Sequence, residues 1–87
     1  MTKKELEALE DKSIKIEWLE DVELQVVENI DNNDNLEISN ETFKKGEIVE
    51  VDVFGINEYY ETVDVQFGDG SCVYTLSTNL FKVLKVE

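Results

Sequence analysis

Alternation of apolar and polar residues with a period of two constrains the fold of this chain more than any other feature. The alternation is clearest where Val49, Val51 and Val53 are separated by Glu50 and Asp52. Successive side chains of a strand point to opposite faces, so such a segment buries one face and leaves the other in water. The segments with this pattern are 13–18, 22–30, 47–54, 59–67, 72–76 and 81–86. The sequence therefore predicts a mainly β protein.

Residues 1–12 have a helical pattern instead. Thr2 and Glu5 have the T-x-x-E spacing of a capping box, and Leu6 and Leu9 lie one helical turn apart. A helix of about ten residues is marginal on its own and needs a surface on which to pack. Two alternatives stay open for this segment, a short helix packed on the β core or a frayed acidic tail. Residues 13–87 are expected to form a single β domain.

The missing residue types exclude several classes of enzyme. The chain has no histidine and a single cysteine, Cys72, so it lacks an imidazole base, a Ser-His-Asp triad and a thiol activated by histidine. Carboxylate pairs arise by chance among 21 acidic residues, so no pair by itself marks a catalytic site. We therefore expect no enzymatic activity and no cofactor. We also expect a cytoplasmic protein, because no apolar run approaches the ~20 residues of a membrane span and no secretory signal begins the chain.

The net charge indicates what kind of partner the protein binds. Lysine supplies all 8 basic residues, and the formal net charge is −13. Nucleic acid is held by lysine and arginine, which displace counterions from phosphate, so this charge argues against direct nucleic-acid binding. The same field attracts basic proteins and raises their association rates. We expect the partner to be a protein with a basic surface, and neither a nucleic acid nor a membrane.

A loop rich in asparagine and aspartate occupies residues 31–35. Asp31, Asn33 and Asn35 match the D-x-N-x-N start of an EF-hand calcium loop. The match then fails, because Leu36 stands where the loop needs glycine and Thr42 stands where it needs a bidentate glutamate. The segment therefore predicts a solvated turn and no metal site, followed by a loop up to residue 42 with a short ragged pair of strands inside it.

The order of several motifs resembles the SH3-like barrels. Phe43-Lys44-Lys45-Gly46-Glu47 before alternating valines is similar to the F-x-x-G-D/E motif at the start of their second strand. Gly68-Asp69-Gly70 is similar to their distal hairpin, and residues 77–84 are similar to their short helical turn and last strand. The resemblance implies a five-stranded SH3-like β-barrel. The chain also resembles small acidic proteins of phages and prophages of Gram-positive bacteria.

The resemblance does not extend to the groove with which SH3 domains bind proline-rich peptides. Leu80 stands where these domains have a groove tyrosine, and Thr78 replaces a groove proline. An aromatic groove is what holds a polyproline ligand, so recognition of proline motifs is not expected.

Aromatic and acidic residues on the polar faces of the strands are the candidates for partner binding. Alternation places Tyr60 on the other face of its strand from Val63 and Val65, so its side chain is expected to point outward, with core packing as the alternative. Trp18 is expected in the core. Tyrosine and tryptophan dominate interface hot spots, so we take Tyr60 and Phe54 as candidate anchors. The candidate steering acids are Asp31, Asp34, Glu37, Glu41, Glu50, Asp52 and Asp64.

Two hypotheses of function follow from these residues. The first is a non-enzymatic interaction module that docks a basic protein surface. The second is an inhibitor that imitates nucleic acid, because carboxylates on one face of a strand recur about every 7 Å, close to the spacing of phosphates. A protein of the second kind occupies the nucleic-acid channel of a host enzyme.

Overall fold

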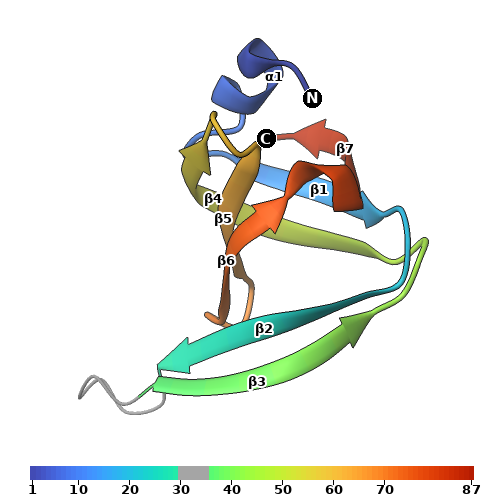
Figure 1. Ribbon diagram of the computed structural model, residues 1–87, viewed down its shortest axis with the longest axis vertical. Coiled ribbons are helices and arrows are strands. Elements are labelled where there is room, and N and C mark those ends of the chain that lie inside the picture. Colours follow the sequence, from blue (N-terminus) through green and yellow to red (C-terminus); the bar gives the residue numbers. More distant parts are fainter. Residues whose placement is uncertain (30–35) are drawn as a thin grey trace.

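The computed structural model describes residues 1–29 and 36–87 of the chain (Figure 1). Over these residues the chain forms one short α-helix, seven strands and a single turn of 3-10 helix. Their bounds are α1 Lys3–Glu7, β1 Ser13–Trp18, β2 Val22–Asn29, β3 Leu36–Phe43, β4 Ile48–Asn57, β5 Thr62–Phe67, β6 Cys72–Ser77, η1 Thr78–Leu80 and β7 Phe81–Val86. The predicted mainly β fold is confirmed. Asp31 and Asp34, with the asparagine-rich loop, lie outside the described residues.

The strands form one open antiparallel sheet in the order β3-β2-β6-β5-β4-β1-β7. The prediction of a closed five-stranded barrel is therefore wrong. One reason is that residues 36–43, expected to be mostly loop, form a full strand that pairs with β2 over its whole length. A second reason is that β1 and β2 are separate strands at distant positions of the sheet, although only residues 19–21 connect them.

The connection between β1 and β2 is one side of a sharp bend in a long two-stranded ribbon. β1 pairs with β4 up to Glu17 and Ile48, and β2 pairs with β3 from Val22 and Phe43 onward. At the bend the N–H of Gly46 donates to the carbonyl of Trp18 at 2.8 Å. Gly46 has a φ of 88°, a conformation that glycine adopts without steric cost.

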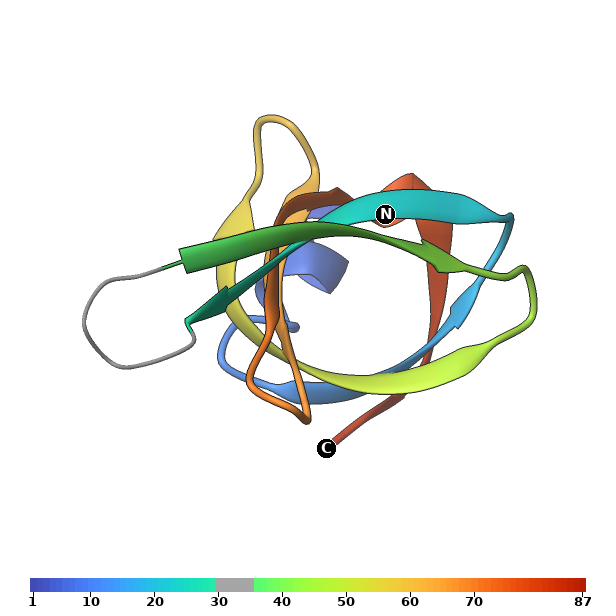
Figure 2. The same ribbon diagram turned by 90° about the horizontal axis from the view of Figure 1, so that it is seen from below.

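The bend carries the β2–β3 arm back across the curled sheet (Figure 2). The arm meets β6 at a single residue pair, Val27 and Cys72. The carboxylate of Asp21 fixes the bend from outside by accepting the backbone N–H of Lys45 at 2.8 Å. The sheet therefore curls around its core, with β3 and β7 at its two edges.

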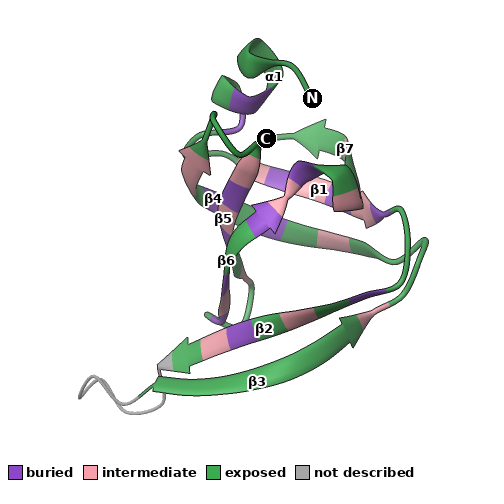
Figure 3. Ribbon diagram, viewed as in Figure 1, coloured by how far each residue is buried: buried purple, intermediate pink, exposed green. Residues whose placement is uncertain are grey.

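The core lies on the inner face of the curled sheet, and fully buried residues alternate with half-buried or exposed ones along β1, β4 and β5 (Figure 3). Trp18 is fully buried, as the sequence predicts, and its ring lies 5.0 Å from that of Phe43. Burying such a side chain contributes roughly 1.5–3 kcal/mol. The buried apolar residues are Leu6, Leu9, Ile14, Ile16, Trp18, Val22, Val26, Val51, Val53, Val63, Val65, Val73, Leu76 and Phe81.

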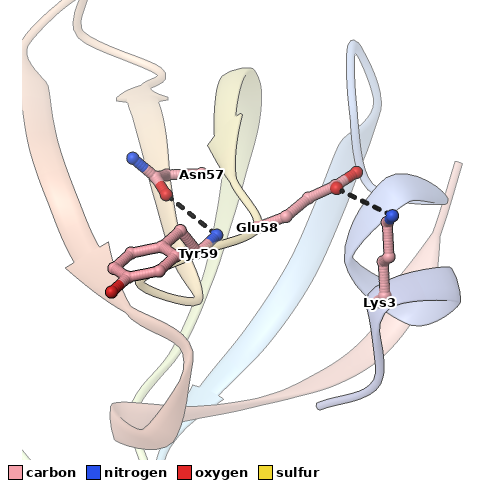
Figure 4. A network of polar contacts seen from close by, with 4 residues as sticks. All are labelled: Lys3, Asn57, Glu58 and Tyr59. Atoms are coloured by element: carbon pink, nitrogen blue, oxygen red, sulfur yellow. Dashed lines mark hydrogen bonds and ion pairs between the residues drawn. The ribbon is translucent and has the colours of Figure 1, made fainter.

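Residues 1–12 contain a packed helix and not a frayed tail. The Thr2 side chain accepts the N–H of Glu5, and the Glu5 carboxylate accepts the N–H of Thr2, which together form the predicted capping box. Leu6 and Leu9 are both buried. Lys3 also forms an ion pair with Glu58 at 3.5 Å, which joins α1 to the turn between β4 and β5 (Figure 4).

Of the helices that the described residues form, none has the length and apolar character needed to cross a membrane.

Candidate partner-binding surface

Two irregularities of pairing flank the same residue of β5, Asp64. On one side the β4–β5 register shifts between Val53 and Gly55, so Phe54 is an extra residue in β4. On the other side the β5–β6 register shifts between Val63 and Val65, which leaves an extra residue in β6 at Tyr74–Thr75. Such β-bulges redirect side chains and are common next to functional sites. Both bulges redirect aromatic residues here.

The carboxylate of Asp64 contacts both bulges. Its Oδ1 accepts the backbone N–H of Thr75 at 2.9 Å. Thr75 has a φ of 53°, which is unusual for a β-branched residue and is kept only where its surroundings hold it. On the β4 side a Cβ at Gly55 would lie 2.6 Å from Oδ2 of Asp64, so a larger residue there would force this carboxylate to shift. Asp64 therefore holds the β6 bulge by a hydrogen bond and lies close to Gly55 at the β4 bulge.

The bulges present Phe54 and Tyr74 as an aromatic pair across β5. Their ring centroids lie 5.6 Å apart at an interplanar angle of 84°, the edge-to-face arrangement that aromatic rings prefer. Phe54 is 45% exposed and Tyr74 is 53% exposed. Phe54 was predicted as an anchor, whereas Tyr74 was not singled out, although its position after the buried Val73 is a usable signal.

A second aromatic pair lies in the turn between β4 and β5. The side-chain oxygen of Asn57 accepts the backbone N–H of Tyr59 at 3.0 Å (Figure 4). It also accepts the backbone N–H of Tyr60 at 3.0 Å. The two tyrosine rings lie 4.8 Å apart, and Tyr60 is 70% exposed. Core packing of Tyr60 is therefore excluded. Its exposure comes from its place in the turn, because β5 begins only at Thr62 and not at residue 59 as predicted.

The five predicted steering acids within the described residues do not gather at one place. Glu50 lies on β4, 4.0 Å from Lys15, and Asp52 accepts a hydrogen bond from the Ser13 hydroxyl. Asp64 lies on the neighbouring strand β5, where it pairs with Gly55 of β4. Glu37 and Glu41 lie instead on β3, the edge strand of the arm. The structure thus places Glu50 and Asp52 on β4 with Phe54, Asp64 on the neighbouring strand β5, and the two other acids on β3.

Cys72 lies after the β5–β6 turn and is not an activated thiol. Partial burial, and then the negative charge of Asp69, raise the pKa of Cys72 above its ordinary value. The pKa of Asp69 is itself lowered, because its carboxylate accepts hydrogen bonds from the hydroxyl and the backbone N–H of Ser71. A thiolate is the reactive form of cysteine, so this environment makes the thiol a poor nucleophile, as expected from the sequence.

A groove of about 540 Å³ lies between α1 and β7. Apolar side chains dominate its lining, with Leu9, Leu19 and Phe81 among them, and its charged residues are Glu5 and Lys82.

Comparison with known proteins finds no matching family model, no similar curated protein and no similar solved structure. The surface is therefore interpreted from its own geometry.

Proposed function

We propose that this protein is a non-enzymatic interaction module that docks a basic protein surface on the face containing Phe54 and Tyr74. The observation that supports the proposal most is the pair of bulges on either side of Asp64, which presents the two aromatic rings to solvent. Aromatic residues in contact with each other and half in water are typical anchors of protein interfaces.

The geometry of the bulges favours a role in binding over a role in packing. Val53, Val65 and Val73 fill the core from the same three strands, so Phe54 and Tyr74 are not needed there. Thr75 keeps a left-handed backbone conformation next to the pair, which costs stability. Strained backbone held by specific contacts is common at binding sites.

The charge of the protein specifies the chemistry of the partner. The net charge is −13, and Glu50, Asp52 and Asp64 belong to the same strands as the aromatic residues or to the strand between them. Complementary charge accelerates the encounter and excludes acidic partners, whereas buried aromatic contacts slow dissociation. A basic surface with an apolar recess is the complement of this face.

The nucleic-acid imitator fits the described acids less well. Such a protein needs rows of carboxylates that are free to replace phosphates. Glu50 lies near Lys15, and Asp52 accepts a hydrogen bond from Ser13, so two of the predicted acids already have partners on β1. An imitator also has no use for an exposed aromatic pair.

The test begins with capture of binding proteins on the immobilised 87-residue protein. We propose a Gram-positive bacterium as the host, from the expected likeness to phage proteins, and the lysate is therefore taken from such a bacterium. The captured partner is then purified, and its affinity is measured for the wild type, Phe54→Ala and Tyr74→Ala. Leu84→Ala is the matched control, because Leu84 is a 40% exposed apolar residue on β7.

We expect each aromatic variant to weaken binding about tenfold or more, the range of interface hot spots, with Leu84→Ala near the wild type. Equal affinities for all four proteins, together with competition by soluble DNA and a steep loss of affinity in salt, contradict the proposal and favour the imitator. Circular dichroism of each variant checks that the sheet is intact.

A further inference from the structure

The two edge strands of the sheet differ in how they are protected against pairing with another chain. β7 has six residues, two of which are Lys82 and Lys85, and its register with β1 shifts once along the pair. Short length, lysine side chains and bulges are the usual means by which proteins block an edge strand. β7 combines all three.

β3 has none of these protections. It has eight residues, contains no lysine, proline or glycine, and pairs with β2 without a register shift. Its other edge pairs with no strand in residues 1–29 and 36–87. Each of its residues is exposed except Phe43, and β3 is green along almost its whole length in Figure 3. A long, regular and exposed edge is a template on which another strand can add.

The two faces of β3 have different chemistry. Leu36 and Ile38 share one face and are 61% and 62% exposed, and Ile38 lies opposite Val27 of β2. Glu37 and Glu41 share the opposite face, since alternate residues of a strand point to opposite sides. A strand that pairs with β3 therefore meets apolar side chains on one face and carboxylates on the other.

A second copy of this protein is a poor occupant of the edge. Antiparallel pairing of two β3 strands about Ser39 sets Glu37 of each copy opposite Glu41 of the other, and like charges directly opposite destabilise a strand pair. Each copy also has a net charge of −13, which opposes association. The acids that repel a second copy attract a basic strand.

We infer that the free edge of β3 accepts an extended basic segment of another protein as an added antiparallel strand. Lysine or arginine of that segment lies opposite Glu37 and Glu41, and apolar residues lie opposite Leu36 and Ile38. Main-chain hydrogen bonds supply affinity, and the alternation of charge and apolar surface supplies specificity. The inference goes beyond the proposed function, because this edge is separate from Phe54 and Tyr74 and requires neither.

The experiment is an NMR titration of the ¹⁵N-labelled 87-residue protein with a capped octapeptide in which lysine and valine alternate. A block peptide of the same composition, with four lysines followed by four valines, is the control for attraction by charge alone. Amide hydrogen exchange of β3 is measured with and without each peptide. We expect the alternating peptide to shift β3 resonances, to slow exchange of those β3 amides that face the free edge by about tenfold or more, and to bind more tightly than the block peptide.

Variants then test the residues. Glu37→Gln with Glu41→Gln is compared with Glu10→Gln and Glu20→Gln, a pair of exposed acids outside the sheet that loses the same charge. We expect the β3 double variant to lower the affinity for the alternating peptide about tenfold, and the control double variant to lower it about twofold or less. Ile38→Ser tests the apolar face in the same way and is expected to weaken binding.

Equal binding of the two peptides, β3 amides that stay as accessible to exchange as in the free protein, or equal effects of the two glutamate pairs would overturn the inference. The variants Phe54→Ala and Tyr74→Ala distinguish it from the proposed function. They are expected to bind the alternating peptide as the wild type does, so failure of one proposal leaves the other standing.

Discussion

The carboxylate of Asp64 accepts the backbone N–H of Thr75 at 2.9 Å, and Thr75 has a φ of 53°. The hydrogen bond thus stabilises a backbone conformation that threonine otherwise avoids. Because Tyr74 is the preceding residue and packs on Phe54, the same bond fixes one half of the exposed aromatic pair. A single acid of β5 therefore links the backbone of one neighbouring strand to the binding face.

Replacing Asp64 by alanine should lower the free energy of unfolding by about 1–2 kcal/mol, because a charged acceptor is lost and the Thr75 N–H is left without it. Asp64→Asn keeps an acceptor oxygen and should cost less. Chemical denaturation of both variants measures the difference. A stability of Asp64→Ala equal to that of the wild type would show that the carboxylate does not hold the bulge.

Gly55→Ala should destabilise the protein by about 1–3 kcal/mol, because the added Cβ would lie 2.6 Å from Oδ2 of Asp64. Gly68→Ala is the matched control, since a Cβ at Gly68 meets no atom within 4 Å. In the double variant with Asp64→Ala the clash disappears, so the two costs should not add. Simple additivity in the double-mutant cycle contradicts the proposed contact.

The docking of α1 should depend on pH through Glu7. The pKa of Glu7 is raised because the side chain shares a hydrogen bond with Glu58 and lies beside its negative charge. The folded protein therefore binds this proton more tightly than the unfolded chain does. The resulting stabilisation is fully present below the ordinary pKa of 4.5 and is lost as the pH rises through the raised pKa.

Thermal unfolding of the wild type and Glu7→Gln at pH values below and above 4.5 measures this loss of stability. The glutamine keeps its hydrogen bond at every pH, so the variant should lose less stability than the wild type as the pH rises above 4.5. Glu20→Gln, an exposed acid distant in sequence from α1, is the control and should follow the wild-type curve. Parallel curves for the wild type and Glu7→Gln would refute the role of Glu7.

Cys72 should react with iodoacetamide more slowly than the cysteine of an unstructured peptide at the same pH, because burial and Asp69 raise its pKa. Asp69→Asn removes the charge and should increase the rate. Mass spectrometry of the alkylated protein gives both rates. A thiol that reacts as fast as the peptide contradicts this account of its surroundings.

The alternating valines predicted most of the strands because a buried face imposes a period of two on the sequence. The helical turn at η1 and the bounds of β7 were also predicted, from residues 77–80 and 81–86. The strand β3 was mostly missed because both its faces are exposed, so burial imposes no pattern on Leu36–Phe43. The sharp bend at residues 19–21 has no signal in the sequence, since the alternation continues on both sides of it.

The candidate surface was predicted only in part. Phe54 and Asp64 were named, but residues 55–58 were expected to be a connection, whereas β4 continues through Gly55 to Asn57. A bulge leaves no periodic signal because it inserts one residue into one strand, and the registers on either side still look regular. The pairing of Phe54 with Tyr74 therefore has no signal in the sequence and follows only from the fold.

The most direct test of the proposed function is a double-mutant cycle at Phe54 and Tyr74, with the Kd of the captured basic partner as the readout. The proposed function predicts a loss of about tenfold or more for Phe54→Ala and for Tyr74→Ala, and a double variant that loses less than the product of the two, because each ring positions the other. Two results together would contradict it. Both single aromatic variants would bind with the wild-type Kd, and the double variant Glu10→Gln with Glu20→Gln would weaken the complex more than either aromatic variant does.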